Sequence, residues 1–258
     1  MPTVTLLIKA YNDFQLKLID KFLKAKLKGL KVKTEIRGIT SRRWVQTTVS
    51  GEDERVAQHY LADEIGLCPT RLESLRKFMT IRGRITSLNK SRIEFYVDIG
   101  VFSPYVIDAA IPLQHLQAQL VDGRKISLKK IAELFGFCEN LSLSVKIHNV
   151  DQDNRRIDTT LSERQISQYK GWTKSLLDRL IVLGASFHEV MLAIKQTRCN
   201  RDIIKIETFG LLEHAIVCKL GTDAVGLIPK IGGKLWMANF SIFNPTEIMG
   251  ILGDYSMF

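Results

Sequence analysis

The sequence has little that could support a membrane span, a disulfide framework or a metal centre. Its 258 residues contain no apolar run of the roughly 18 residues that a membrane crossing needs. The N-terminal residues lack a signal-peptide pattern. Scattered cysteines without close pairs are typical of buried, reduced thiols. We therefore expect a cytoplasmic protein with no membrane partner and four such thiols, at Cys68, Cys138, Cys199 and Cys218.

Motifs for catalysis are also missing. The Gly-x-Ser-x-Gly elbow of hydrolases does not occur, and the acidic residues form no nuclease-like cluster. The Gly221-Thr222-Asp223 loop lacks the Gly-Lys-Ser/Thr pattern of a phosphate loop, so a tight hairpin turn is the better interpretation. We expect no catalytic residue, no cofactor and no metal. The histidines stand apart in the sequence, at His59, His115, His148, His188 and His214.

The net charge of +10 favours a polyanionic partner, and its distribution is uneven. Residues 1–50 contain eleven Lys or Arg and three Asp or Glu, a balance of +8, which leaves +2 for the other 208 residues. The positive field is therefore concentrated at the start of the chain. This region reads as a βαββα sandwich, with strands at 3–10, 32–38 and 43–50 and helices at 13–30 and 53–66.

The first predicted helix has a lysine ridge. At about 100° per residue its lysines share one sector, and Phe14, Leu18, Phe22 and Ala25 share a second sector that we expect to pack. We expect no acidic partner at i±4, because Asp13 and Asp20 are poorly spaced for the later lysines. RNA binding is the favoured interpretation and a solvated face the alternative. The ridge consists of Lys17, Lys21, Lys24 and Lys28.

A second basic group surrounds a predicted hairpin turn and consists of Arg37, Arg42, Arg43 and Trp44. Guanidinium and indole groups bind phosphates and stack on bases. The interpretation of Trp44 stays open, because a tryptophan at the start of a strand can equally belong to the core.

The central region has the pattern of a small five-stranded β-barrel. Ile93, Phe95, Val97 and Ile99 fall on one face of a strand, with Glu94, Tyr96 and Asp98 on the other. A helical insert with a Ser127 cap follows the third strand, over residues 127–137. The five strands are expected at 79–86, 93–100, 106–113, 141–150 and 156–161.

This region resembles the OB-fold RNA-binding domain of the ribosomal protein S-one type. The resemblance rests on Gly83, the Val97-x-Ile99-Gly100 strand end, Ile111-Pro112-Leu113, Val145-x-Ile147 and the closing residues 156–164. Two positions depart from the family pattern, which often has an aromatic where Ile93 stands and a histidine where Pro112 stands. The resemblance implies RNA contacts at Tyr96, Arg155 and Arg156, with Arg82, Arg84 and Arg92 nearby. Alternatively, the barrel is a scaffold and Tyr96 packs against a neighbouring domain.

The last region mixes strands and helices, with a strand expected over Ala224–Pro229 after the Gly221 turn. That segment echoes residues 108–112 of the barrel, so a duplicated half-barrel is an open alternative. Two segments, Gly210–Ala215 and Gly221–Ala224, make the whole chain similar to a conserved archaeal family. This second resemblance implies a lineage and no activity.

We therefore predict a three-part α+β protein: a basic ferredoxin-like sandwich over 1–77, an OB-type barrel over 78–170 and an α+β domain over 171–258. Its expected role is that of a non-catalytic RNA-binding factor for ribosomal RNA, transfer RNA or another structured RNA, possible protein partners being ribosomal or RNA polymerase proteins. The alternatives are a protein-interaction adaptor of the transcription or translation machinery and an RNA-processing enzyme.

Overall fold

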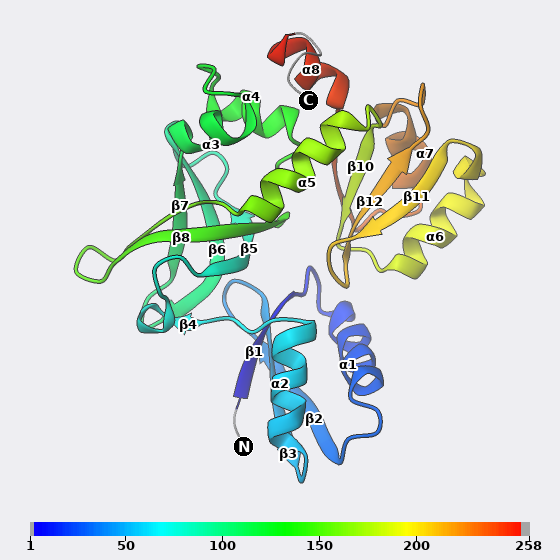
Figure 1. The fold of residues 1–258 in the computed structure, drawn as a ribbon. Coiled ribbons are helices and arrows are strands. Elements are labelled where there is room, and N and C mark those ends of the chain that lie inside the picture. The colour runs from blue at the N-terminus through cyan, green and yellow to red at the C-terminus, as the bar shows by residue number, and fades with distance from the viewer. Residues whose placement is uncertain (1–2, 254–258) are drawn as a thin grey trace. The chain divides into compact units, whose positions relative to one another are not determined.

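The computed structural model describes residues 3–253, which form two compact units. The first unit contains residues 3–74 and 100–106, and the second contains residues 75–99 and 107–253. The whole chain is a mixed α+β protein, as predicted from the sequence (Figure 1). Each unit is described by itself.

The first unit has the predicted βαββα order. Its strands form an antiparallel three-stranded sheet in the order β1-β3-β2. Two short elements follow, β4 (Thr70–Arg71) and a 3-10 turn at Leu72–Ser74. The five main elements are β1 (Thr3–Lys9), α1 (Phe14–Lys26), β2 (Val32–Ile39), β3 (Trp44–Gly51) and α2 (Glu54–Glu64).

The face by which α1 packs differs from the predicted one. Ile19 and Leu23 are fully buried, whereas Phe14, which was expected to pack, is 80% exposed. Successive residues of a helix are rotated by about 100°, so the buried pair lies one residue away from the predicted pair Leu18 and Phe22. Both sets are apolar at helical spacing, and periodicity alone could not choose between them. Only contact with the sheet distinguishes the two faces.

The predicted barrel is present, and its strands belong to the second unit except for residues 100–103 at the end of β6, which are counted with the first. Its strands are hydrogen-bonded in the order β6-β5-β8-β9-β7, and a further β6–β7 pairing closes the ring. β7 and β9 run parallel, and the β5–β6, β5–β8 and β8–β9 pairs are antiparallel. A Cβ on Gly83 would lie 2.6 Å from a Val97 methyl group, so this strand position has no room for a side chain. The barrel strands are β5 (Thr80–Thr86), β6 (Glu94–Ser103), β7 (Ile107–Pro112), β8 (Ser142–Asp151) and β9 (Arg156–Leu161).

Two helices, not one, connect β7 to β8. The predicted Ser127 cap is present, because the Ser127 hydroxyl accepts a hydrogen bond from the Lys130 amide at 3.3 Å and α4 (Leu128–Leu134) follows. The preceding helix α3 (Leu113–Leu120) starts at Leu113, directly after the Ile111-Pro112 strand end. It buries Leu116 and Leu120.

The C-terminal part of the second unit is built on a four-stranded antiparallel sheet in the order β11-β12-β10-β13. One face buries Leu180, Val182 and Ile216 together with residues of α6 and α7. Its strands are β10 (Arg179–Leu183), β11 (Ile203–Thr208), β12 (Glu213–Cys218) and β13 (Asn239–Phe243). The helices are α5 (Glu163–Lys174), α6 (Phe187–Gln196), α7 (Ile228–Gly232) and α8 (Pro245–Leu252).

An aromatic cluster connects this sheet to the helices of the barrel region. Phe243 of β13 lies with its ring centroid 6.2 Å from Phe135 and 5.2 Å from Trp172 of α5. Tyr169 contacts the same rings and is 2% exposed. Burial raises the pKa of the Tyr169 hydroxyl well above its usual range. The barrel region and the C-terminal sheet thus share one apolar interior.

The four cysteines are free thiols. Cys68, Cys199 and Cys218 are buried as expected, whereas Cys138 is only partly buried. Desolvation raises the pKa of Cys138 and of Cys218 to about 12, so both are protonated and unreactive at neutral pH.

The predicted strand over Ala224–Pro229 is wrong. These residues form a 3-10 turn at Val225–Leu227 and the start of α7, and they bury Leu227 against the sheet. A short apolar run is compatible with either a buried strand or a buried helix. The Gly221 turn therefore does not join two strands, and the half-barrel repeat is wrong as well, because residues 108–112 are a strand and 225–229 are helical.

Gly221 is nevertheless needed for its backbone conformation, since its φ is +83°. A Cβ at this position would meet no atom within 4 Å, so the cost of a side chain is purely conformational. Gly221→Ala should lower the free energy of unfolding by about 1 kcal/mol. Chemical denaturation followed by circular dichroism measures this change. Asp223→Asn is the control: Oδ1 of Asp223 accepts from the Val225 amide at 2.8 Å, and an amide oxygen keeps this bond. Equal stabilities of wild type and Gly221→Ala would show that the positive φ does not require a glycine at this position.

Candidate nucleic-acid interface

β6 places Tyr96 on the outer side of the barrel. Phe95, Val97 and Ile99 are buried, as the alternation predicted. The alternation fails at two positions. Ile93 is 70% exposed because it precedes the first residue of β6, and Asp98 is buried although it shares the face of Tyr96. Tyr96 itself is half-buried, so part of its ring is available to a ligand.

A lysine and a carboxylate fix the Tyr96 ring. Nζ of Lys90 lies 4.9 Å from the ring centroid, within the range of a cation–π interaction. The Tyr96 hydroxyl donates a hydrogen bond to Oε2 of Glu94 at 2.9 Å. This hydrogen bond to Glu94 is the main cause that raises the pKa of Tyr96, and partial desolvation raises it further. The ring is thus held as a neutral phenol beside a cation.

Arg156 belongs to the same cluster. Its guanidinium lies 2.5 Å from Oε1 of Glu94 and 2.7 Å from Oδ1 of Asp158. The hydrogen bond from Arg156 lowers the pKa of Glu94, so that carboxylate stays ionised. Arg156 was predicted to contact RNA directly. Its two carboxylate partners, Glu94 and Asp158, would compete with an RNA phosphate for this guanidinium.

The loops beside this cluster carry the remaining predicted cations. Arg92 is exposed in the β5–β6 loop, which also holds Lys90. Arg155 is exposed in the β8–β9 turn, where its φ is +52°. In OB folds the equivalent pair of loops borders the oligonucleotide-binding face. Lys90, Arg92 and Arg155 are therefore exposed cations in the two loops that flank the Tyr96 cluster. Lys90 was missed from the sequence because an isolated loop lysine gives no pattern.

Arg84 is a correction to the predicted set. Its side chain is 5% exposed, and Nη2 lies 3.1 Å from Oε2 of Glu213, whose side chain is 2% exposed. Arg84 also donates to the Asn140 carbonyl at 3.4 Å. A buried cation that is paired with a carboxylate does not contact RNA. Arg82, two residues earlier, does reach solvent. Partial desolvation and the nearby guanidinium groups of Arg84 and Arg164 lower its pKa.

An open groove of about 670 Å³ continues from Glu94 along the barrel. It contains Ile93 and Pro112, the two positions at which the chain departs from the family pattern. Its other lining residues come from α3 and the segment before α4. The groove is bordered by one lysine, Lys125, and by the amides of Gln114 and Gln117.

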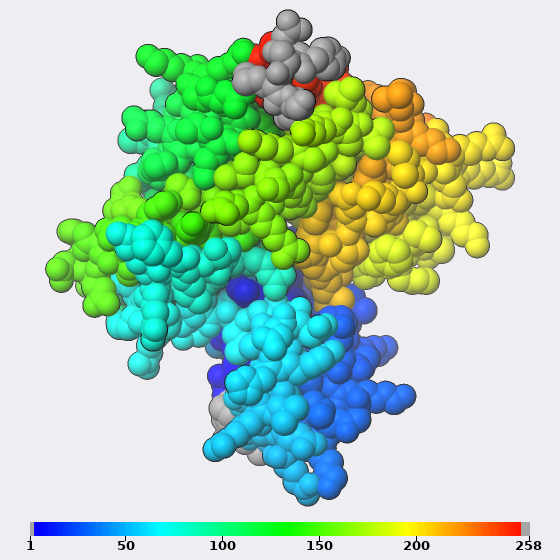
Figure 2. Space-filling model, viewed as in Figure 1, coloured from blue at the N-terminus to red at the C-terminus, as the bar shows by residue number. Residues whose placement is uncertain are grey.

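In the first unit, the lysine ridge is exposed but is not uniform. α1 is drawn in blue, and long side chains project from the blue surface in Figure 2. Lys24 lies 2.6 Å from Asp20, so the expectation of no acidic partner at i±4 is wrong. Within residues 3–253, Lys17, Lys21 and Lys28 make no ion pair, and Lys28 lies just beyond the end of α1.

The basic hairpin group is divided between surface and core. Trp44 is only 1% exposed, and Nζ of Lys9 lies 4.6 Å from the centroid of its ring. Trp44 is therefore a core residue, and the prediction that it contacts RNA is corrected. Arg43 lies 3.1 Å from Asp13, and Arg37 lies 3.4 Å from Glu35. Arg42 is half-buried in the turn. Arg37 is therefore the exposed arginine of this predicted group.

Two other features are absent from the described residues. No three or more His, Cys, Asp or Glu side chains within 3–253 are arranged to hold a metal ion. Over the same residues, no helix combines the length and hydrophobicity of a membrane crossing.

Three family models match consecutive parts of the chain. The DUF2110 N-terminal domain matches residues 3–70, the DUF2110 central domain matches 77–173, and the DUF2110 C-terminal domain matches 177–243. The chain belongs to the DUF2110 family. The DUF2110 central domain contains the five barrel strands and the Tyr96 cluster, and the DUF2110 C-terminal domain contains Glu213, the partner of Arg84.

Solved structures resemble this DUF2110 chain only weakly. An uncharacterized protein, MJ1198 from Methanocaldococcus jannaschii, is 10% identical over 34% of this chain and 95% of its own, with a TM-score of 0.23. A chain of the a/eIF2alpha-aDim2p-rRNA complex from Pyrococcus horikoshii OT3 is 9% identical over 48% of this chain and 64% of its own, with a TM-score of 0.26. A Thermus thermophilus protein, ttk003000868, is 14% identical over 97% of this chain and 42% of its own, with a TM-score of 0.17. No curated protein matches the chain.

Proposed function

We propose that this chain is a non-catalytic, cytoplasmic RNA-binding factor whose barrel binds single-stranded segments of a structured RNA, such as ribosomal or transfer RNA. One observation carries the proposal: a partly exposed tyrosine ring lies on an OB-type barrel, with Lys90 at 4.9 Å and two further exposed cations, Arg92 and Arg155, in the flanking loops. An aromatic platform beside cations is the usual arrangement for single-strand binding. The resemblance to S-one-type domains supports the same function.

The chain offers two different kinds of RNA contact. Lys17, Lys21 and Lys28 of the first unit provide charge without a stacking partner, which gives affinity without sequence preference. The Tyr96 cluster contains both signs of charge, because Glu94 and Asp158 accompany Arg156. Its contribution is therefore stacking more than attraction of phosphate. The two contributions differ in their dependence on salt, so experiments can separate them.

The proposal predicts a specific result for the Tyr96 ring. Tyr96→Ala should weaken binding of a labelled single-stranded RNA of about 12 nucleotides by roughly 1–3 kcal/mol and leave the dependence of log Kd on log salt nearly unchanged, because stacking releases few counterions. Fluorescence anisotropy over a range of salt concentrations measures both quantities.

Tyr96→Phe is the matched control. It removes the hydrogen bond to Glu94 and keeps the ring, so its RNA affinity should stay close to that of wild type. If Tyr96→Ala binds RNA as tightly as Tyr96→Phe and its melting temperature falls, the ring is a packing residue and the barrel is not the RNA-binding element.

A second candidate function, a protein-interaction adaptor, is favoured by a different surface. Trp236 is 80% exposed and borders a groove of about 150 Å³ between α6 and the 234–238 segment. Leu192 and Met237, both more than two-fifths exposed, line the same groove. Exposed tryptophan and methionine are characteristic of protein interfaces. A partner bound there would remain in stoichiometric amount after nuclease treatment of a lysate, whereas a partner held through RNA would be released.

A further inference from the structure

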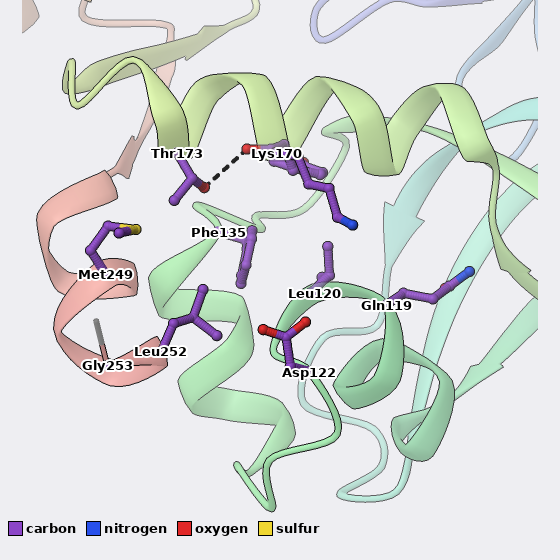
Figure 3. A pocket seen from close by; sticks show the side chains of 10 residues that line it. Gln119, Leu120, Asp122, Phe135, Lys170, Thr173, Met249, Leu252 and Gly253 are labelled. Atoms are coloured by element: carbon purple, nitrogen blue, oxygen red, sulfur yellow. Dashed lines mark hydrogen bonds between the residues drawn. The ribbon is translucent and has the colours of Figure 1, made fainter. Parts of the chain in front are cut away.

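A pocket of about 230 Å³ lies within the second unit, and its lining contains no residue of a barrel strand (Figure 3). Its walls come from the end of α3, the turn that follows, α5 and α8, and Phe135 forms part of its floor. Leu120, Met249 and Leu252 make much of the remaining lining apolar. The volume is below the roughly 300–1,000 Å³ of pockets for drug-sized ligands, so a smaller molecule would fit.

One wall is a tight turn that holds Asp122. Asp122 and Gly123 have φ values of +52° and +77°, and the Arg124 amide donates to the Val121 carbonyl at 3.0 Å. Positive φ at both central residues defines a type I′ turn, for which Asp-Gly is a favoured sequence. Arg124 then donates both ends of its guanidinium to the Ile251 and Leu252 carbonyls at the end of α8. The turn and α8 are thereby fixed to each other, and the pocket exists without a ligand.

The side-chain amide of Gln119 and the hydroxyl of Thr173 are already used within the protein. The Gln119 amide donates to the Leu161 carbonyl at 3.0 Å and accepts from the Leu161 amide at 3.1 Å. The Thr173 hydroxyl donates to the Tyr169 carbonyl at 3.0 Å. The two charged residues are different. Asp122 and Lys170 make no ion pair among residues 3–253, and Figure 3 shows both side chains beside the same space.

We propose that this pocket binds a free α-amino acid with an apolar side chain. The ammonium group of such a ligand would pair with Asp122 and its carboxylate with Lys170. Its side chain would replace water against Leu120, Phe135 and Leu252. A ligand with a single charge would pair with only one of Asp122 and Lys170. A ligand without an apolar part would make no contact with the apolar lining of the pocket. The site is separate from the proposed RNA function and does not depend on it.

The test uses the full chain and isothermal titration with L-leucine, L-methionine and L-phenylalanine. We expect at least one to bind, and we expect its N-acetyl amide and its decarboxylated amine not to bind. Asp122→Asn, which tolerates positive φ, and Lys170→Gln should each weaken binding by about tenfold or more, because each removes a charge-assisted hydrogen bond. Lys129→Gln, an exposed substitution outside the pocket, should bind as wild type does.

Three results would overturn the proposal. The first is no binding by any of the three amino acids at millimolar concentration. The second is binding that Asp122→Asn and Lys170→Gln leave unchanged although both variants keep the wild-type melting temperature. The third is equal binding by the uncharged derivative or by the amine, which would show that the pocket recognises an apolar group or a cation rather than an amino acid.

Discussion

Replacing Glu213 with alanine is expected to lower the free energy of unfolding by about 3–5 kcal/mol. The substitution removes the carboxylate that lies 3.1 Å from the buried Arg84 guanidinium, and removing one partner of a buried ion pair is strongly destabilising. Space is also tight here, because a Cβ on Gly210 would collide with Oε2 of Glu213. Urea denaturation of the variant and of wild type measures the difference.

Two further variants make this result specific. Glu163→Ala removes an exposed carboxylate that lies 3.4 Å from Lys146, and it should change stability far less. The double substitution Arg84→Met with Glu213→Leu removes both charges and should recover most of the loss, since apolar replacement of a buried pair is often neutral. If Glu213→Ala were no worse than Glu163→Ala, the pair would not be a principal contact of the second unit.

The second large effect is expected for RNA binding by the first unit. Replacing Lys17, Lys21 and Lys28 together with glutamine should weaken binding roughly 50-fold at about 0.15 M salt, because each lost phosphate contact lowers the salt slope by about 0.7 for a single strand. The slope itself should therefore fall by about 2. Anisotropy titrations with the same RNA over a range of salt concentrations measure both values.

A matched triple variant shows whether the weaker RNA binding comes from the loss of net charge or from the loss of these particular lysines. Lys129, Lys195 and Lys219 are exposed lysines of the second unit, and their replacement by glutamine changes the net charge by the same amount. This control should keep most of the salt slope. Lys24→Gln alone should have a small effect because Lys24 is paired with Asp20. Equal losses in the two triple variants would mean that the lysines of α1 form no binding surface.

Local patterns predicted the strands of the barrel well and failed in the segment after Gly221. The alternation around Phe95, Val97 and Ile99 is a property of one strand, and the structure has these residues buried. The residues after Gly221 form a short apolar run, which does not distinguish strand from helix until its neighbours are known. The face of α1 was misassigned for a similar reason, because Ile19 and Leu23 are offset by one residue from an equally apolar set.

Contacts between distant residues account for most of what the sequence did not predict. Arg84 and Glu213 are 129 positions apart, and nothing near Arg84 in the sequence indicates that it is buried. Lys90 was missed beside Tyr96 because a cation–π contact depends on the path of a loop. Asp122 and Lys170 likewise line one pocket only because the turn after α3 packs beside α5 and α8. Such pairs have no periodic signature.

The aromatic cluster around Tyr169 has a consequence for how the chain can be divided. Family models treat residues 77–173 and 177–243 as separate domains. Phe135, Tyr169 and Trp172 come from the first segment, and Phe243 from the second, yet they surround one another in a single interior. Separating the two segments would expose aromatic rings of both to solvent. We therefore expect the two sequence domains to unfold together as one cooperative unit.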